Sequence, residues 1–451
     1  MEKITIDEIK RATGCEVFLA EGAGGVNEIT DIVTDTRKFA GKSGALFIPL
    51  KGENFDGNDY IDDFFAKNGT AALKTRDGMK ALADLARAYR SRFDLPVVAV
   101  TGSAGKTMTK EMLGSVLSMK YKTLKTEGNF NNEIGLPLTI FGIDDTIEVA
   151  LVEMGMNSLG ELSRLSSIAR PSICVITNIG TAHIGKLGSR DNILRAKLEV
   201  LDFIQPNGVV ALNADDERLY GLRGKLHYRT IFFGVKNEPD ESSRDGYVRA
   251  RNLRLGDNGA FFEVELDGMV YDVHIEQVGE HNVYNALAAI AVGHELGVPV
   301  EEILNGLRGT APIDGRQKIR KIAGLTVIDD SYNANLESML AGLKTLAHMG
   351  GGTSRKIAVL GSMLEQGEFA EKGHKMVGRA ARDSGVDYII TIGDDANAYI
   401  GGDVRCGTVE EVYSALTAYA KKGDIVLLKG SRGVALERLI RLMESTVENG
   451  E

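Results

Sequence analysis

The chain has 451 residues, of which 43% are hydrophobic and 26% charged, and its formal net charge is -10. This composition is typical of a folded globular protein of about two to four domains, and the acidic balance argues against general nucleic-acid binding, which needs a basic surface. The N-terminal segment lacks the apolar core of a signal peptide, no apolar run approaches the roughly 18 residues that span a bilayer, and three widely spaced cysteines favour a reducing cytoplasm.

The first predicted unit covers residues 1–95. We expect a short helix near residues 5–13, a strand within "ALFIPLKG", and helices near residues 57–67 and 78–92. Pro96 then interrupts the chain just before a β-branched run. These elements predict a small α/β N-terminal domain.

The second predicted unit, residues 96–313, alternates strands and helices. The runs "IEVALVEM", "SICVITN" and "GVVALNADD" are typical of buried strands, with helices expected near 106–119 and 189–204. Two alternating runs meet at Asp267-Gly268, a strong hairpin signal, and a helix is expected over residues 281–296. The pattern predicts a mostly parallel sheet, of the kind found in P-loop proteins, with an antiparallel edge.

The third predicted unit, residues 314–451, repeats this alternation. Its expected strands are "LTVIDD", "KIAVLGSM", "DYIITIG" and "DIVLLKG", and each precedes a plausible helix. The chain is therefore predicted to be an α/β protein of three domains, the last with a Rossmann-like open sheet. Ligands of such sheets bind beyond the carboxyl ends of the strands, so candidate functional residues are sought there.

The stretch "VVAVTGSAGKTMTKEML", from Val97 to Leu113, predicts a strand, a phosphate-binding loop and a helix. The full P-loop pattern places a glycine where this chain has Val100. Main-chain amides between Gly102 and Thr107 can nevertheless converge on a phosphate at the start of a helix, with Lys106 reaching its outer oxygens. The alternative is a glycine-rich turn that binds nothing.

Several acidic and basic residues follow predicted strands. Glu153 and the pair Asp329-Asp330 could hold Mg²⁺ together with phosphate oxygens, or could be turn and cap residues. His183 lies in a loop and Lys197 on a helix, where a hydrogen-bonding histidine and a surface lysine are the simpler interpretations.

Other polar segments also allow both a ligand-binding and a purely structural interpretation. The loop with Asn129, Asn131 and Asn132 suits sugar hydroxyls and phosphates, but also turns and caps. His281 and Asn282 begin a helix and can cap it or contact a base. Positive charge is expected in loops at the following residues: Arg37, Arg316, Lys429 and Arg432.

Taken together, these segments resemble the Mur ligases, the ATP-dependent amide-forming enzymes of peptidoglycan precursor synthesis. "TGSAGKT" is similar to that family's shortened phosphate loop. The segments most like the branch that joins D-alanyl-D-alanine to UDP-N-acetylmuramoyl-tripeptide are "GNFNNEIGLPLT", "EMGMNSLGEL", "TNIGTAHI", "AKLE", "GEHNVYNALAA" and "DDSYNAN". "DTRKFAGKSGALFIPLKGENFDGNDYI" is similar to the UDP-binding domain of that branch, and the resemblance runs from residue 30 to 440.

The resemblance implies an acyl-phosphate mechanism and assigns residues to it. The catalytic residues would be Lys106, Glu153, His183 and Lys197. The residues implied at ATP are Gly102, Ser103, Ala104, Gly105, Lys106 and Thr107 at the phosphates, Asn282 and Asn285 at adenine, Arg316 at the phosphates and Asp330 at ribose. Two Mg²⁺ ions would be held by Thr107, Glu153, His183 and Lys197, the last carbamylated by CO₂.

Substrate-binding residues are implied in the same way. Those at the UDP end are Thr36, Arg37, Glu53, Asn54, Phe55, Asp56 and Gly57. Those expected at the peptide and amine substrates are Asn129, Asn131, Asn132, Asn333, Asn335, Lys429, Ser431 and Arg432. A cytoplasmic monomer is expected, with UDP-N-acetylmuramoyl-tripeptide and D-alanyl-D-alanine as small-molecule substrates and without nucleic acid or membrane insertion.

Two positions depart from the family pattern: Leu336 replaces a usual proline and Ser362 a usual acid. Leu336 affects how a helix starts. Ser362 is expected in a strand-end loop near the amine-binding side. The sequence therefore supports the identity of the second substrate less strongly than it supports the ATP chemistry. The competing hypotheses are a sibling ligase that adds glutamate or a diamino acid, a P-loop NTPase that acts as a switch or motor, and a non-enzymatic ATP-binding protein.

Overall fold

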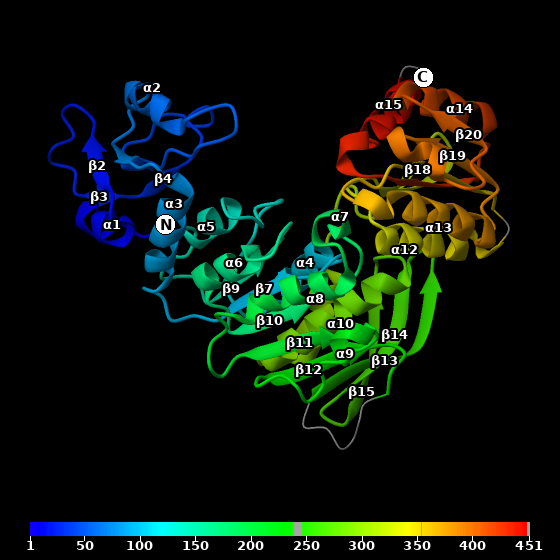
Figure 1. Ribbon diagram of the computed structural model, residues 1–451. Coiled ribbons are helices and arrows are strands. Elements are labelled where there is room, and N and C mark those ends of the chain that lie inside the picture. The colour runs from blue at the N-terminus through cyan, green and yellow to red at the C-terminus, as the bar shows by residue number, and fades with distance from the viewer. Residues whose placement is uncertain (239–245, 353, 449–451) are drawn as a thin grey trace.

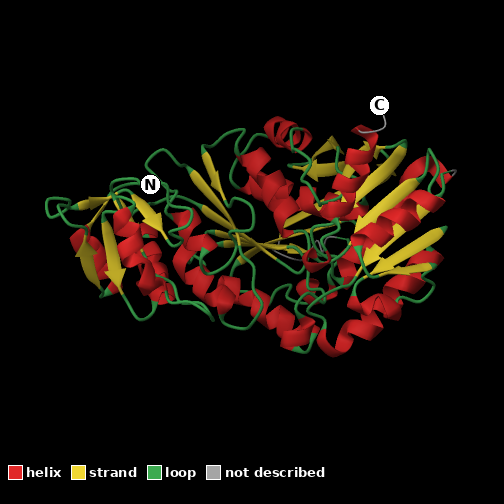
Figure 2. Ribbon diagram, turned by 90° about the horizontal axis from the view of Figure 1, so that it is seen from above, coloured by secondary structure: helices red, strands yellow, loops and turns green. Residues whose placement is uncertain are grey.

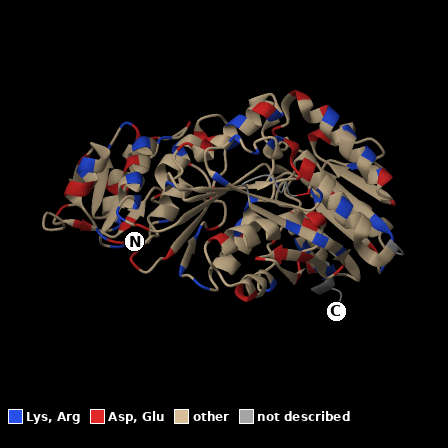
Figure 3. Ribbon diagram, turned by 90° about the horizontal axis from the view of Figure 1, so that it is seen from below, with Lys and Arg blue, Asp and Glu red and all other residues tan. Residues whose placement is uncertain are grey.

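The computed structural model describes residues 1–238, 246–352 and 354–448. The molecule is elongated, with the N-terminal domain at one end, the C-terminal domain at the other and the central domain between them (Figure 1). Basic and acidic residues are interspersed over all three domains (Figure 3). None of the described helices combines the length and the apolar character needed to cross a bilayer.

The N-terminal domain carries a four-stranded sheet and a two-stranded one. The larger has the order β2 (Glu16–Leu19), β6 (Ala71–Lys74), β5 (Ala45–Phe47) and β4 (Asp31–Val33), and the smaller pairs β1 (Ile4–Thr5) with β3 (Glu28–Ile29). The helices are α1 (Ile6–Thr13), η1 (Gly57–Tyr60), α2 (Ile61–Ala66) and α3 (Gly78–Arg90).

The central domain is built on a nine-stranded sheet that is parallel from β8 to β13 and antiparallel beyond β13. Its order is β15 (Met269–Ile275), β14 (Gly259–Leu266), β13 (Gly246–Gly256), β12 (Arg229–Gly234), β11 (Val209–Asn213), β10 (Ile173–Ile176), β7 (Val97–Thr101), β9 (Val149–Glu153) and β8 (Thr123–Lys125). The helices are α4 (Lys106–Leu117), α5 (Gly135–Ile140), α6 (Glu161–Ala169), α7 (Ile184–Leu187), α8 (Arg190–Leu198), η2 (Glu199–Leu201), α9 (Glu217–Tyr220), α10 (Glu280–Glu295) and α11 (Val300–Arg308).

Both faces of the central sheet are covered by helices, which explains its continuous apolar strands. Along β7, Val97 and Ala99 belong to a core shared with α5 and α6, whereas Val98 and Val100 belong to a core shared with α4 and α10. Because successive side chains of a strand point to opposite faces, a strand buried on both sides is apolar on both faces, except at its carboxyl end, where β7 has Thr101.

The C-terminal domain has a six-stranded sheet, visible with its covering helices in Figure 2. The order is β16 (Lys318–Ile322), β17 (Leu325–Asp330), β21 (Ile425–Lys429), β18 (Lys356–Gly361), β19 (Tyr388–Ile392) and β20 (Val404–Cys406), with β16 antiparallel to β17 and the other pairs parallel. The helices are α12 (Leu336–His348), η3 (Met349–Gly352), η4 (Gly367–Phe369), α13 (Ala370–Asp383), η5 (Asp394–Ala398), α14 (Val409–Tyr419), η6 (Arg432–Val434) and α15 (Glu437–Glu448).

The architecture predicted from the sequence is confirmed, including the hairpin at Asp267-Gly268, whose two residues have positive φ of 52° and 74°. The shortened phosphate loop is also explained. Val100 is a fully buried residue of β7, and the strand continues to Thr101, so the loop begins only at Gly102. The proposed domain boundaries near residues 95 and 313 stay a prediction.

Helix α3 joins the N-terminal and central domains. Arg90, at its end, is 4% exposed and donates hydrogen bonds to the carbonyls of Ala169, Phe93 and Leu95, at 3.0, 2.6 and 3.0 Å. One hydrophobic core includes residues of both domains, for example Leu82 and Leu165. These two domains are therefore packed as one body.

Replacing Arg90 with methionine should weaken this junction. The substitution removes three charge-assisted hydrogen bonds and leaves their carbonyls buried without donors, a loss of about 2–4 kcal/mol. For domains of this size, we expect Tm to fall by about 5–10 °C in calorimetry. Arg76→Met is the control because Arg76 is exposed. Equal melting temperatures for the two variants would show that Arg90 does not stabilise the junction.

Candidate functional site

A cavity of about 450 Å³ lies between the central and C-terminal domains. Its walls come from the residues at or just after the carboxyl ends of β7, β9, β10, β11, β17 and β21, together with the N-terminal turns of α4, α10 and α12. The carboxyl ends of both parallel sheets thus face one space, as expected for α/β proteins that bind ligands at these edges.

The loop between β7 and α4 depends on glycine at two positions. Gly102 has φ 146°, and a Cβ atom there would lie 1.9 Å from Oγ1 of Thr177. Gly105 has φ 84°, in the left-handed region that favours glycine, and caps the start of α4. The loop is consequently held tightly against the end of β10.

Asn178 occupies two of the loop's main-chain amides. The amide of Ser103 donates to the Asn178 carbonyl at 3.0 Å, and the amide of Ala104 donates to Asn178 Oδ1 at 2.9 Å. These two amides are not available to a phosphate in this structure. The first turn of α4, from Gly105 to Thr107, is where amides lack an acceptor within the helix and the dipole attracts an anion.

Lys106 begins α4 and lines the cavity. Its ammonium group donates to the Gly102 carbonyl at 2.8 Å. Burial lowers the pKa of Lys106, while the neighbouring carboxylate of Glu153 raises it. A half-buried cation that has no ion pair with any of the described residues is ready to receive an anionic ligand.

Glu153 ends β9, is 2% exposed and keeps one oxygen free. Its Oε1 accepts from Asn131 Nδ2 at 2.8 Å, whereas Oε2 has no hydrogen-bond partner among the described residues. The main chain of Glu153 is fixed by Thr126, whose carbonyl accepts from buried Lys110. An unpartnered buried carboxylate oxygen, aimed into a cavity, suits a cation.

Lys197 was expected from its spacing to be a surface residue, and that interpretation is wrong. The side chain is 1% exposed because α8 turns it into the protein, and burial lowers its pKa well below the usual value. The charge of Lys106 lowers it further, while Glu161 and Glu153 raise it. Burial of this kind disfavours the charged ammonium form relative to the neutral amine.

His183 joins the two domains at the edge of this site. Its Nδ1 lies 2.7 Å from Oε2 of Glu365, and burial lowers the pKa of the imidazole to about 4 although Glu365 opposes this. Further contacts between the domains are Gly185 N to the Glu365 carbonyl at 3.2 Å, Thr181 Oγ1 to Glu337 Oε2 at 3.0 Å, and Asn335 Nδ2 to the Ser103 carbonyl at 3.3 Å. The C-terminal domain is thus docked on the phosphate loop.

Asn282 and Asn285 line the cavity at the start of α10. Asn285 Nδ2 donates to Asn282 Oδ1 at 2.9 Å, and Thr109 donates to Asn285 Oδ1 at 3.0 Å. His281 lies beside them, and burial lowers its pKa to about 4. Uncharged, hydrogen-bonding side chains of this kind suit a heteroaromatic base.

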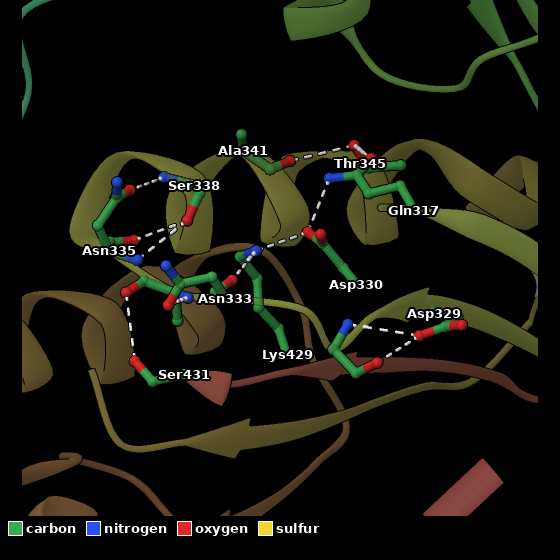
Figure 4. A network of polar contacts seen from close by, with 12 residues as sticks. Gln317, Asp329, Asp330, Asn333, Asn335, Ser338, Ala341, Thr345, Lys429 and Ser431 are labelled. Carbon is green, nitrogen blue, oxygen red and sulfur yellow. Dashed lines mark hydrogen bonds and ion pairs between the residues drawn. The ribbon is translucent and has the colours of Figure 1, made fainter. Parts of the chain in front are cut away.

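A polar network fixes the C-terminal wall (Figure 4). Lys429 Nζ lies 2.7 Å from Asp330 Oδ2, which also accepts from Gln317 at 3.2 Å. Asn335 caps α12 by accepting from the Ser338 amide, so Leu336 is compatible with the helix start without proline. Ser362, in place of an acid, is buried and accepts from the Asp395 amide at 3.0 Å.

The residues predicted for the UDP end do not line this cavity, because they belong to the N-terminal domain. Thr36 is buried and its carbonyl accepts from Lys67, whereas Arg37 pairs with Asp35 at 2.8 Å. Asp56 caps η1, and the ring of Phe55 is 54% exposed. No contact joins this group to the phosphate loop among the interactions of the described residues.

Most of the other predicted residues meet at the cavity. Those that line it are Ser103, Ala104, Gly105, Lys106, Thr107, Asn129, Asn131, Asn132, Glu153, His183, Asn282, Asn285, Arg316, Asp330, Asn333, Asn335 and Lys429. Lining residues that the sequence did not single out include Asn178, Asn213, Phe233, Tyr284, Tyr332 and Glu337. Asn178 and Tyr332 fall within motifs already quoted, and Asn213 ends a predicted strand. Their positions in the sequence were therefore the only indication that they line the cavity.

Comparisons with known proteins agree with this geometry. The family models for the Mur ligase middle domain and the Mur ligase, glutamate ligase domain match residues 100–293 and 315–432. A UDP-N-acetylmuramoyl-tripeptide–D-alanyl-D-alanine ligase of Bacillus subtilis is 35% identical over 92% of this chain and 94% of its own. A MurF crystal structure from Acinetobacter baumannii is 32% identical with a TM-score of 0.88, over 99% of both chains. MurF from Thermotoga maritima in complex with ADP is 28% identical with a TM-score of 0.83, over 93% of this chain and 98% of that one.

Proposed function

Because the chain belongs to the Mur ligase family, we propose that it is the ATP-dependent ligase that joins D-alanyl-D-alanine to UDP-N-acetylmuramoyl-tripeptide. The observation that carries this proposal is the interdomain cavity, where Lys106, the free oxygen of Glu153 and the C-terminal residues Arg316 and Asn333 lie on one space. A binding protein or a switch would not need a second domain that places groups such as Arg316 and Asn333 on the cavity beside the phosphate loop.

The reaction requires activation of a carboxylate. In the first step, an oxygen of the tripeptide's terminal carboxylate bonds to the γ-phosphorus of ATP, and the bond from phosphorus to the bridging oxygen of ADP breaks. We assign Lys106 and the amides of Gly105–Thr107 to the negative charge on the transferred phosphoryl group. Arg316 enters from the C-terminal domain, where it lines the same cavity.

In the second step, the free amine of D-alanyl-D-alanine attacks the acyl carbon. The carbon–oxygen bond to phosphate breaks, phosphate leaves, and the amine loses a proton as the peptide bond forms. Water must be kept from the acyl phosphate, and we assign this task to the docked C-terminal domain. Asn131 and Asn132 from the central domain and Asn333 and Asn335 from the C-terminal domain lie along the wall of the cavity, where we place the peptide.

The residues around the phosphate loop fit Mg²⁺. The described residues contain no group of three or more His, Cys, Asp or Glu side chains placed to hold a metal on their own, but magnesium bound with phosphates usually takes only one or two protein carboxylates. We propose that Thr107, Glu153, His183 and Lys197 hold Mg²⁺ at two sites. The ions would supply positive charge for phosphoryl transfer.

The uncharged amine is the form that reacts with CO₂, and the burial that lowers the pKa of Lys197 favours this form, which supports carbamylation of Lys197. The carbamate would replace a basic side chain by an anionic oxygen ligand.

We also assign the UDP end to Thr36, Arg37 and the turn from Glu53 to Gly57. We propose that the protein is a monomer, and the use of ATP favours the cytoplasm.

Docking of the C-terminal domain should be sensitive to one glycine. A Cβ atom on Gly185 would lie 2.7 Å from the Gly367 amide and 2.8 Å from the Glu365 carbonyl. We expect Gly185→Ala to prevent full closure and to lower kcat by about 10- to 100-fold, since small misplacements of reacting groups have effects of this size. Gly407→Ala is the control, because a Cβ atom there would meet only the Glu411 carboxylate, at an ordinary contact distance of 3.6 Å. An unchanged kcat would rule out this contact as part of the active state.

The function itself is tested by phosphate release with a panel of UDP-muramoyl peptides and amines. We expect turnover only when ATP, UDP-N-acetylmuramoyl-tripeptide and D-alanyl-D-alanine are all present. Turnover that requires a single amino acid in place of the dipeptide would identify a sibling ligase. ATP hydrolysis that needs no acceptor would instead indicate a switch or motor.

A further inference from the structure

We propose that Lys110 is a positioning residue: its buried ammonium group ends the pairing between β8 and β9 and thereby fixes Glu153 and Asn131 at the phosphate site. This inference rests on the proposed function, in which Glu153 holds Mg²⁺. Lys110 itself is not among the residues that line the cavity, so it acts through the groups that it holds.

Lys110 is a buried cation that the mechanism does not use. In the part of the chain that the structure describes, three lysines are 1% exposed: Lys110, Lys197 and Lys429. Lys197 is assigned to the metal, and Lys429 pairs with Asp330 at 2.7 Å. Burying an ammonium group is costly unless it is paired and hydrogen-bonded. The partners of Lys110 therefore indicate what the lysine holds in place.

Lys110 has two partners. Its Nζ donates to the Thr126 carbonyl at 2.7 Å and lies 3.0 Å from Oε1 of Glu111. Burial raises the pKa of Glu111, but hydrogen bonds from Lys125 and Lys110 bring it below its usual value. Ionised Glu111 thus compensates the charge of Lys110. The other contact, with the Thr126 carbonyl, points toward the site.

This carbonyl lies where the ladder between β8 and β9 stops. The two strands run parallel and are paired as far as Lys125 and Leu151, and the Thr126 amide still donates to the Leu151 carbonyl at 2.9 Å. In a regular parallel ladder the next bond would join the Glu153 amide to the Thr126 carbonyl. Here that carbonyl accepts from Lys110, and the Glu153 amide donates to Thr126 Oγ1 at 3.0 Å. Lys110 therefore takes the carbonyl out of the ladder, and the chain leaves the sheet.

The loop that leaves the sheet returns to the end of β9. The Gly155 amide donates to the Asn131 carbonyl at 2.8 Å, and Asn131 Nδ2 donates to Glu153 Oε1 at 2.8 Å. Oε2 of Glu153 is left without a hydrogen-bond partner among the described residues. The direction of this free oxygen thus depends on where the chain leaves the sheet, which Lys110 sets.

Helix α4 connects this contact to the phosphates. Lys106 and Lys110 are four residues apart on α4, so their side chains lie on one face of the helix. One rigid element therefore carries the lysine assigned to the phosphates and, through Thr126, positions the carboxylate assigned to the metal.

The test measures ADP binding by isothermal titration calorimetry, with Mg²⁺ and with EDTA. The ratio of the two affinities reports the contribution of the metal and needs no ligase substrate. Lys110→Met removes the donor to Thr126, whereas Thr126→Val removes the hydroxyl that holds Glu153 and keeps the carbonyl. Two controls are matched to them. Lys125→Met removes the other ion pair of Glu111 without touching Thr126, and Thr126→Ser keeps the hydroxyl.

We expect the gain in ADP affinity from Mg²⁺ to fall at least about 10-fold in Lys110→Met and in Thr126→Val, the lower end of the range for groups that support a metal ligand. ADP affinity in EDTA should stay unchanged, because Lys106 remains in place. Both substitutions break the same link, so the double variant should lose no more than the more affected single variant. Both controls should keep the wild-type gain.

Each other outcome contradicts the assignment. Equal losses with Mg²⁺ and with EDTA would assign Lys110 to the phosphate loop, and additive losses in the double variant would make Lys110 and Thr126 independent supports of the fold. A wild-type gain in Lys110→Met would remove its positioning role. If that variant does not fold, Thr126→Val decides alone, and a wild-type gain there contradicts the link.

The same titrations separate this inference from the proposed function. A wild type whose ADP affinity does not respond to Mg²⁺ would contradict the proposed metal site, and the inference with it. A wild type that responds to Mg²⁺ but does not use D-alanyl-D-alanine would contradict the proposed ligase activity and leave the role of Lys110 standing.

Discussion

Replacing Lys106 with alanine is expected to lower kcat by about 100- to 1000-fold, the loss typical of removing one preorganised charge from a transition state. Lys106 starts α4 and hydrogen-bonds the Gly102 carbonyl at 2.8 Å, beside Glu153. In the proposed mechanism, the lysine lies where negative charge accumulates as the carboxylate attacks ATP. Steady-state phosphate release with all three substrates measures the effect.

The same variant should not be less stable than the wild type. Burial lowers the pKa of Lys106, which means that its positive charge is poorly solvated when no phosphate is bound. Alanine removes that unfavourable burial, so we expect an equal or higher Tm. Lys122→Ala, at an exposed lysine, is the matched control and should change neither quantity. Full activity in the Lys106 variant would contradict the assignment of the phosphates to this loop.

Removing Lys197 is expected to have a comparable effect for a different reason. The amine is 1% exposed and its pKa lies well below the usual value, chiefly because of burial. In the proposed function this amine reacts with CO₂, and the carbamate would place an anionic oxygen ligand near Glu153 and His183. We expect Lys197→Ala to lower kcat by about 100-fold or more, because even the loss of a group that only supports a metal ligand costs about 10- to 100-fold.

Two further observations separate a carbamate from an ordinary lysine. Short carboxylates such as formate or acetate should partly restore the activity of Lys197→Ala, because they can supply the missing anionic oxygens. Removal of dissolved CO₂ should lower the activity of the wild type reversibly, whereas Lys186→Ala, at an exposed lysine nearby in sequence, should behave as wild type. Full activity of Lys197→Ala without added carboxylates would contradict the carbamate.

The elements predicted with success are those whose signals are local. The phosphate loop follows from a β-branched strand, two glycines and a helical pattern within Val97–Leu113, and the hairpin follows from Asp267-Gly268. Strands β8 and β20 have only three residues each, and β16 carries four exposed or half-buried positions, so their patterns are weak. Tertiary pairing, more than local propensity, makes these segments strands.

The candidate site was less accessible to sequence reasoning, because its arrangement depends on contacts between distant segments. His183 and Glu365 come together only when the C-terminal domain docks. The burial of Lys197 depends on how α8 packs, and its spacing indicated a surface residue. Asn178 accepts hydrogen bonds from the amides of Ser103 and Ala104, and the spacing of residues in the motif does not predict these bonds. The residue types at strand ends were predictable, whereas their partners were not.

The most direct test of the account follows one oxygen atom. UDP-N-acetylmuramoyl-tripeptide labelled with ¹⁸O in its terminal carboxylate is incubated with ATP, D-alanyl-D-alanine and the enzyme, and the released phosphate is examined by mass spectrometry. An acyl-phosphate route transfers one carboxylate oxygen to phosphate for each peptide bond formed, so labelled phosphate is the predicted result. Peptide formation with all of the label retained in the peptide and its unreacted precursor would contradict the mechanism, and unlabelled phosphate released without peptide would contradict the ligase function.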